Sequence, residues 1–272
     1  ILLAVDIPAR LAGEARDLAL KVLQIVAIIA LVGGAPAVRY LLVKVAEPVR
    51  RTQQMVITWR DLVDLLRFPP CRRTVACWFI NGVANGLPAV LFPLIVHDLL
   101  QLDDQALYVL LTLYFLAAVV TAPAWLIAAR SIGKAGAWRL AIALNILVFA
   151  QAWWLSPALA HWFATICILS GATLGADLIL PPSIQADVLE ADRTSCGRER
   201  AASAFALWSM ATKLALALGI ALAFLSVGAT QGTQLAVSTD RLLLVYVVVP
   251  IALKSAVYIM LRSDFLSAGK YA

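Results

Sequence analysis

The sequence predicts an all-α, polytopic membrane protein with seven transmembrane helices. Of its 272 residues, 62% are hydrophobic and 14% are charged, against roughly 45–50% and about 25% in an ordinary soluble domain. The mean hydropathy of +0.89 indicates more apolar surface than one core can bury. These values exclude a soluble globule, a disordered chain, a collagen and a coiled coil.

Seven apolar stretches approach the length of about 20 residues that a transmembrane helix needs. Turn or charged residues separate them, and the last six follow one another through short loops. We therefore expect three parts: an extracellular start with one helix (1–38), a basic central loop (39–73) and a six-helix bundle (74–272). The predicted spans are 18–38, 74–96, 107–129, 137–155, 159–182, 202–229 and 242–261.

The placement of positive charge predicts the orientation. Lys and Arg gather in every second connection, chiefly in 39–73, 130–139 and 183–201, and such loops face the cytoplasm. The net charge of +6 thus reflects membrane topology, and no nucleic-acid partner is expected. In a bacterial inner membrane, the chain would begin on the outer side and end in the cytoplasm. It has neither an initiator Met nor a signal peptide, so we interpret it as a fragment.

One segment of the central loop has the pattern of an interfacial helix. In TWRDLVDLLR at 58–67, four apolar side chains share one helical face, and charged residues flank them. The four are Trp59, Leu62, Val63 and Leu66. Such a helix lies in the plane of the membrane surface. We expect it to anchor the loop there.

Lys213 is the leading candidate for a functional residue. It lies about eleven residues into a span that starts near Ala202, hence roughly 16 Å deep at about 1.5 Å per residue. A charge at the bilayer centre costs about 2.5–3.5 kcal/mol on insertion scales, which makes it a functional hypothesis by default. Phe205, Ser209 and Leu216 share its helical stripe. The alternative is a Lys held in a permanent ion pair between helices.

Two further charges fall within predicted spans. Asp177 lies nearer the cytoplasmic end of its helix and is a candidate for the transport pathway or a buried partner at a helix end. Lys254 is about eight residues from the end of its own span. We expect it to extend to the membrane surface.

The span at 74–96 carries amides and glycines at helical spacing. Asn81 and Asn85 form one stripe, and Gly82 and Gly86 form the adjacent one. The glycines favour close approach of a neighbouring helix, and the amides either line a polar path or bond between helices. Pro88 and Pro93 favour bending of the same helix. Three aromatic residues elsewhere are candidates for stacking on a ligand ring, or else lie at the lipid interface: Tyr114, Trp125 and Trp208.

Motifs for metal, redox or enzymatic chemistry are missing. The four cysteines form no CxxC, and His97 and His161 are far apart, so neither a metal site nor a disulfide framework is indicated. The sequence contains no HExxH or GxSxG motif at membrane depth. We therefore expect no enzyme activity and no cofactor.

The stretch PPSIQADVLEADRTSCGRERAASAFALWSMATKLALALG at 181–219 resembles the glycoside–pentoside–hexuronide:cation symporters, the melibiose-permease branch of the major facilitator superfamily. The family pattern is an acidic run, a basic turn and a Lys in the next helix, with Glu190 here in place of an Asp and Ala202 near the usual position of a Gly. NGVANGLPAVLF at 81–92 and YFLAAVVTAPAWLIAARSIGK at 114–134 are similar to the family's seventh and eighth helices. The matching residues are Asp187, Glu190 and Asp192, then Gly197, Arg198 and Arg200, then Lys213.

The resemblance implies a secondary transporter that moves a sugar-like solute with Na⁺ or H⁺ by alternating access. The chain would be the sixth helix, the central loop and the C-terminal half, with the missing N-terminal half, the solute and membrane lipids as its partners. Lys213 would face that missing half and pair with an acidic cation ligand there. The implied cytoplasmic gate consists of Asp187, Asp192, Arg198, Arg200 and Lys134. Together with the candidates inferred above from residue type and depth, the predicted pathway consists of Lys213, Asn81, Asn85, Tyr114, Trp208, Ser209 and Asp177.

Two alternatives remain open. Relatives in the broad family move lipids or pigments, and the eight tryptophans are compatible with an amphipathic substrate such as a lysolipid. A seven-helix retinal protein shares the number of spans and a Lys in the last one. However, the span at 107–129 has no carboxylate to serve as counter-ion for a Schiff base.

Overall fold

The computed structural model describes residues 32, 34–36, 38–40, 42–44, 59–197, 200–228 and 239–261. The chain divides into two compact units, Ile1–Met55 and Val56–Ala272. The described residues of the first unit are helical, but most of the predicted span at 18–38 lies outside the described residues.

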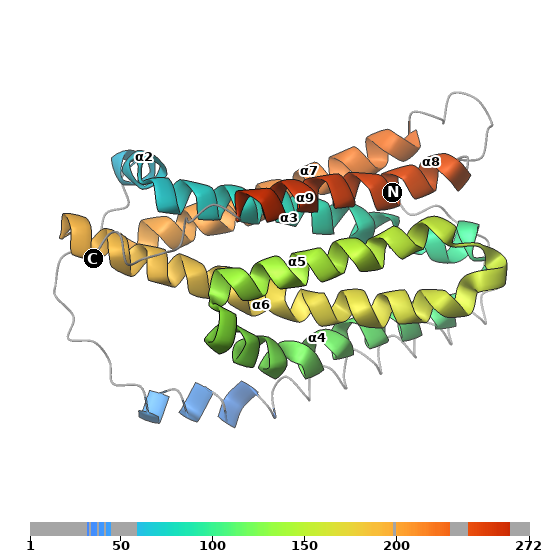
Figure 1. Cartoon of the computed structure of the whole chain (residues 1–272), viewed down its shortest axis with the longest axis horizontal. Helices are drawn as coiled ribbons and strands as arrows, with labels where there is room; N and C mark the ends of the chain where they lie inside the picture. Colours follow the sequence, from blue (N-terminus) through green and yellow to red (C-terminus); the bar gives the residue numbers. More distant parts are fainter. Residues whose placement is uncertain are drawn as a thin grey trace, which may run out of the picture. The chain divides into compact units, whose positions relative to one another are not determined.

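The described part of the second unit contains only helical elements (Figure 1). Some are short 3-10 or π turns (η) that extend or connect the α-helices. In chain order they are α2 (Trp59–Arg67), α3 (Pro69–Leu94), η1 (Ile95–Leu99), α4 (Asp104–Ile132), α5 (Lys134–Gln151), η2 (Ala152–Trp154), η3 (Pro157–Leu159), α6 (Ala160–Cys196), α7 (Ala201–Gly228), α8 (Thr239–Leu243), η4 (Leu244–Val248) and α9 (Val249–Met260).

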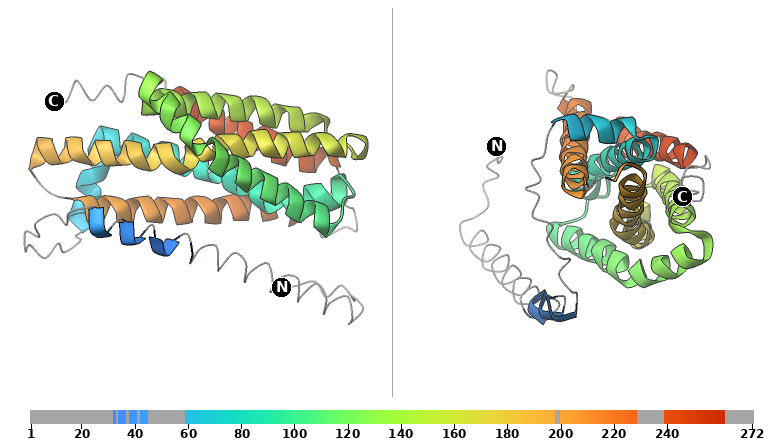
Figure 2. Two further views of the ribbon diagram at one scale, coloured as in Figure 1. Left: turned by 90° about the horizontal axis from the view of Figure 1, so that it is seen from below. Right: turned by 90° about the vertical axis from the view of Figure 1, so that its left-hand side faces the viewer.

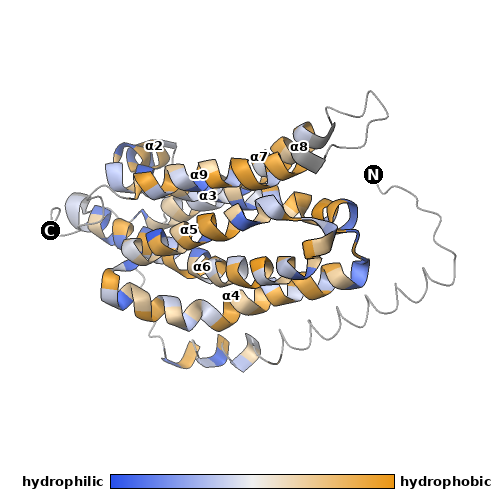
Figure 3. Ribbon diagram, turned by 45° about the vertical axis from the view of Figure 1, so that its right-hand side comes forward, coloured by the Kyte–Doolittle hydropathy of each residue, from blue (hydrophilic) through white to orange (hydrophobic). Residues whose placement is uncertain are grey.

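Six of the predicted spans are confirmed as helices long and apolar enough to cross a membrane. Their outer faces carry large apolar side chains that water would not accommodate: Val119 is 70% exposed and Phe224 is 65% exposed. Hydrophobic residues recur along each of the long helices (Figure 3). The six helical segments are Pro69–Leu99, Asp104–Ile132, Lys134–Trp154, Pro157–Ser195, Ala201–Ser226 and Arg241–Met260.

Local sequence signals fix where the helices start and stop. The Asp103 side chain accepts a hydrogen bond from the Ala106 backbone N–H at 2.9 Å and caps the start of α4. Gly133 separates α4 from α5 at φ +78°, and Gly197 ends α6 at φ +64°. Both values favour glycine.

α3 and α6 each pack against two other long helices. α3 lies beside α7 and α9, whereas α6 lies beside α4 and α5 (Figure 1). In the end-on view of Figure 2, α6 is enclosed by the other helices. Two apolar clusters fill opposite ends of the bundle, one around Phe163 and Leu91 and the other around Trp138 and Ile184. Polar side chains of α3, α5, α6 and α9 lie between these clusters.

Glycines bring two pairs of helices into backbone contact. A Cβ added at Gly82 would lie 2.8 Å from the Cβ of Ala215, and one at Gly219 would lie 3.2 Å from the backbone of Gly86. The prediction that Gly82 and Gly86 allow close approach is therefore confirmed, with α7 as the neighbour. A Cβ at Gly175 of α6 would lie 2.5 Å from the carbonyl oxygen of Ala118 in α4.

Gly175→Ala is expected to destabilise the bundle by about 1–3 kcal/mol, because the obstructing atom is backbone oxygen and α4 must move as a whole. Gly136→Ala is the matched control, since its Cβ would meet only the Ile132 side chain, at 3.6 Å. Thermal unfolding in detergent measures both. Equal unfolding temperatures for the two variants would contradict the tight α4–α6 contact.

The predicted helix of the central loop is confirmed as α2. Leu65 is fully buried, and Trp59, Val63 and Leu66 stay exposed on its surface. This leaves an apolar face available to a membrane surface, as an interfacial helix requires. α3 continues past Pro88 and Pro93 and changes to π geometry at Ile95.

Candidate functional site

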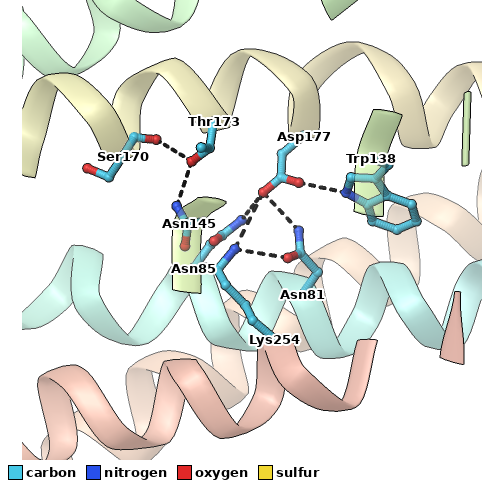
Figure 4. Close-up of polar contacts among 8 residues, drawn as sticks. All are labelled: Asn81, Asn85, Trp138, Asn145, Ser170, Thr173, Asp177 and Lys254. Atoms are coloured by element: carbon cyan, nitrogen blue, oxygen red, sulfur yellow. Dashed lines mark hydrogen bonds and ion pairs between the residues drawn. The ribbon is translucent and has the colours of Figure 1, made fainter. Parts of the chain in front are cut away.

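Asp177 is the centre of a polar cluster inside the bundle. It lies on α6 and is 6% exposed. Its Oδ2 atom accepts hydrogen bonds from the side-chain amides of Asn81 and Asn85, each at 3.1 Å. Its Oδ1 atom accepts one from the indole N–H of Trp138 at 2.7 Å (Figure 4). Three neutral donors thus surround one buried carboxylate.

Lys254 is the fifth member of this cluster and reaches it from α9. It is 2% exposed, its Nζ donates to Asn81 Oδ1 at 3.1 Å, and it lies 3.7 Å from Asp177 Oδ2. The expectation that Lys254 extends to the membrane surface is wrong. Its position along the helix would allow the side chain to reach the membrane surface. Instead, the side chain points between α3 and α6, where it contacts an opposite charge and an amide oxygen.

The positions of the amides follow from the pattern in α3. Asn81 and Asn85 are one helical turn apart and reach the same carboxylate oxygen. The glycine stripe beside them packs on α7, so the amides point toward α6. Asn81 bonds to both charges and therefore links α9 to α6 through α3.

A second polar group lies on the same side of α6. Asn145 of α5 donates to Thr173 Oγ1 at 2.6 Å, and Thr173 donates to the Ser170 carbonyl at 2.7 Å. These residues appear beside the Asp177 cluster in Figure 4. Within the described residues the buried Asn145 Oδ1 atom has no hydrogen-bond partner. The sequence pattern did not single out Trp138, Asn145 or Thr173.

A cavity of about 120 Å³ adjoins the cluster. Asn85 belongs to both, because it lines the cavity and donates to Asp177. Ser170 adds a second polar wall, and most of the remaining lining is aromatic or aliphatic. The aromatic residues that line it are Phe92, Tyr114, Phe115, Phe149, Phe163 and Tyr246.

Two ion pairs form near the end of the bundle that carries α2. Lys134 Nζ lies 2.6 Å from Asp187 Oδ2 and joins α5 to α6. Arg200 donates to both oxygens of Asp192, at 3.0 and 2.6 Å, and joins the start of α7 to α6. The first pair is partly exposed, whereas the second is buried. A bidentate, buried pair is the stronger of the two contacts.

The comparison with protein families assigns the chain to a family. The family model described as MFS/sugar transport protein, from the major facilitator superfamily, matches residues 2–263. The chain belongs to this family. It is therefore a polytopic integral membrane protein, and the match points to a transporter rather than to an enzyme or a retinal protein. A search of curated proteins found no match.

Four of the five predicted gate residues of this major facilitator transporter form the ion pairs Lys134–Asp187 and Arg200–Asp192. Arg198 lies outside the described residues. Glu190 pairs with Arg193 within α6 at 3.4 Å. The resemblance implies ion pairs among these residues, and their role as a gate remains a prediction. Membership of the narrower melibiose-permease branch also remains a prediction.

The predicted pathway residues separate into two groups. Asn81, Asn85 and Asp177 meet in the cluster, and Tyr114 lines the adjoining cavity. The other three lie on α7 and do not reach the cluster. Of these, Ser209 and Lys213 are exposed, and Trp208 stacks on Trp78 with ring centroids 4.7 Å apart.

Lys213 makes no hydrogen bond or ion pair with any described residue. It lies on the face of α7 opposite Ala211 and Ala215, which are buried against the bundle. Phe205 and Leu216 are exposed on the same side. The predicted stripe therefore lies on one exposed side of α7, and the ammonium of Lys213 faces away from the described bundle.

Trp125 has a structural partner. Its indole N–H donates to the Ala172 carbonyl at 2.7 Å, and Thr121 donates to the same oxygen at 3.0 Å. Both contacts join α4 to α6 and give Trp125 a structural role, while stacking on a ligand stays a prediction. Among the described residues no three His, Cys, Asp or Glu side chains gather as a metal site.

Proposed function

We propose that this major facilitator transporter moves a sugar-like solute together with a cation, Na⁺ or H⁺, by alternating access. The observation that carries the proposal is the double role of Asn85, which lines the cavity and bonds to the buried Asp177. The amide of Asn85 can bind solute hydroxyls, and aromatic walls cover the apolar faces of a sugar ring.

The size of the cavity supports a shared binding site. Ligand pockets typically measure about 300–1,000 Å³, more than twice the cavity described here. We infer that a second six-helix bundle completes the site and faces the exposed stripe of α7 around Lys213. The ion pairs Lys134–Asp187 and Arg200–Asp192 would close the cytoplasmic side and break when the site opens inward.

A second candidate substrate is an amphipathic molecule such as a lysolipid. The aromatic lining of the cavity favours it, because six of its thirteen lining residues are Phe or Tyr. The sugar head of such a molecule would bond to Asn85, and its apolar tail would pack along the aromatic rings. The substrate class therefore has to be decided by transport.

Uptake by the complete protein in lipid vesicles tests the proposal. We expect saturable uptake of a sugar panel and none of lysolipids, and a rise of about tenfold in KM for Asn85→Ala, the effect of losing a hydrogen bond worth about 1.5 kcal/mol. Asn145→Ala is the matched control, since this buried amide does not line the cavity. Uptake of lysolipids alone would support the second candidate, and an unchanged KM in Asn85→Ala would exclude Asn85 from the site.

A further inference from the structure

Few charged side chains are buried in the part of the chain that the structure describes. Asp192 belongs to the pair with Arg200 near the end of α6. The other two are Asp177 and Lys254, which lie together between the apolar clusters. Within the described residues, Asp177 and Lys254 therefore form the buried charge pair in the middle of the bundle.

The two charges of the pair are unequally supplied with hydrogen bonds. Asp177 accepts three, from Asn81, Asn85 and Trp138, and none of these donors is charged. The ammonium of Lys254 has three N–H donors, but it makes one hydrogen bond, to Asn81 Oδ1. Its 3.7 Å distance to Asp177 Oδ2 is an ion-pair contact beyond hydrogen-bond length.

This inequality decides which group can change its charge at lower cost. If Lys254 loses its proton, the Asp177 carboxylate loses its counter-ion but keeps all three hydrogen-bond donors. If Asp177 gains a proton, three N–H groups face a neutral carboxyl, and the ammonium loses its counter-ion. The contacts therefore favour Lys254 as the group that exchanges a proton.

We propose that Lys254 is the proton-binding residue of this bundle and that its ammonium occupies the place that a free Na⁺ would take beside Asp177. The step is a simple ionisation: the ammonium releases H⁺ to water and becomes a neutral amine, and rebinding reverses it. The inference rests on the proposed function and names H⁺ as the coupled cation at this site.

The surroundings of the pair agree with this assignment. The oxygens that contact Nζ are a carboxylate and an amide oxygen, the kinds of ligand that hard metal cations prefer. α3 and α5 present only neutral amides and an indole to the pair. Tyr114 of α4, Cys167 of α6 and Tyr246 of η4 line the adjoining cavity, and they are the titratable groups among its lining residues.

Lys254→Arg separates proton exchange from charge pairing, because a guanidinium keeps the positive charge and does not release its proton in proteins. In vesicles of the complete protein without Na⁺, we expect this variant to retain solute exchange and to lose solute accumulation driven by a pH gradient by at least about tenfold. Accumulation equal to that of the unmodified protein would overturn the proposal.

A second variant covers the case in which Arg does not fit the buried site. Asp177→Asn combined with Lys254→Met removes both charges, so no buried charge is left unpaired. It should exchange solute without pH-driven accumulation. If the pair were merely structural, this variant would accumulate solute like the unmodified protein.

A direct titration decides the inference independently of the solute. The nitrogen-15 NMR signal that disappears in Lys254→Arg is assigned to Lys254 Nζ and followed between about pH 5 and about pH 9. A shift from ammonium to amine within that range supports the proposal, and an ammonium that persists throughout overturns it. Absence of sugar transport together with a titrating Lys254 would refute the proposed substrate alone.

Discussion

Replacing Asp177 with Ala is expected to destabilise the bundle by about 3–5 kcal/mol, the cost of removing one partner of a buried ion pair. The variant leaves the Lys254 ammonium 2% exposed with one hydrogen bond, to Asn81. It also leaves Asn85 and the indole of Trp138 without their acceptor. Thermal unfolding of the purified protein in detergent measures the loss.

Asp187→Ala provides the control for this prediction. Asp187 also pairs with a Lys, but its side chain is 54% exposed, and exposed pairs contribute about 0–1 kcal/mol. The two variants should therefore differ by several degrees in unfolding temperature. If Asp177→Ala unfolds at the temperature of Asp187→Ala, the buried cluster does not stabilise the bundle.

Replacing Lys213 with Ala is expected to abolish cation-coupled accumulation without preventing membrane insertion. The side chain is exposed on α7 and bonds to no described residue, so its removal breaks no hydrogen bond or ion pair within the described bundle. A deep Lys nevertheless costs about 2.5–3.5 kcal/mol to insert. The proposed second bundle would supply the partner that offsets this cost.

The control for Lys213 is Leu216→Ala, which shortens an exposed apolar side chain on the same face of α7. This variant should transport at close to the normal rate. Transport by Lys213→Ala at the level of Leu216→Ala would count against a coupling role. Loss of the folded protein in Lys213→Ala would show that the residue has a structural partner instead.

The positions of the helices could be predicted because hydropathy and length determine them. Each predicted span from 74–96 onward overlaps a helix of the structure, and the glycine stripe at Gly82 and Gly86 meets α7 as expected. Depth along a helix is a one-dimensional property. It can be read directly from the chain.

The direction in which a deep charge points could not be predicted in the same way. Lys213 lies deeper in its span than Lys254 does in its own, yet Lys254 is the buried residue and Lys213 is exposed. The face that a helix turns inward depends on its neighbours, and α7 buries its small residues Ala211 and Ala215 against the bundle. Trp138 was missed for a related reason: its ring belongs to the apolar core, and only its indole N–H belongs to the cluster.

The glycine contacts divide the bundle mechanically. α3 is locked to α7, and α4 is locked to α6, at places where even a methyl group would collide. Such close packing opposes separation within either pair, so we expect each pair to move as a unit relative to the other. The hydrogen bonds from Asn81 and Asn85 to Asp177 connect the α3–α7 pair to the α4–α6 pair. We therefore expect them to oppose a displacement of one pair past the other.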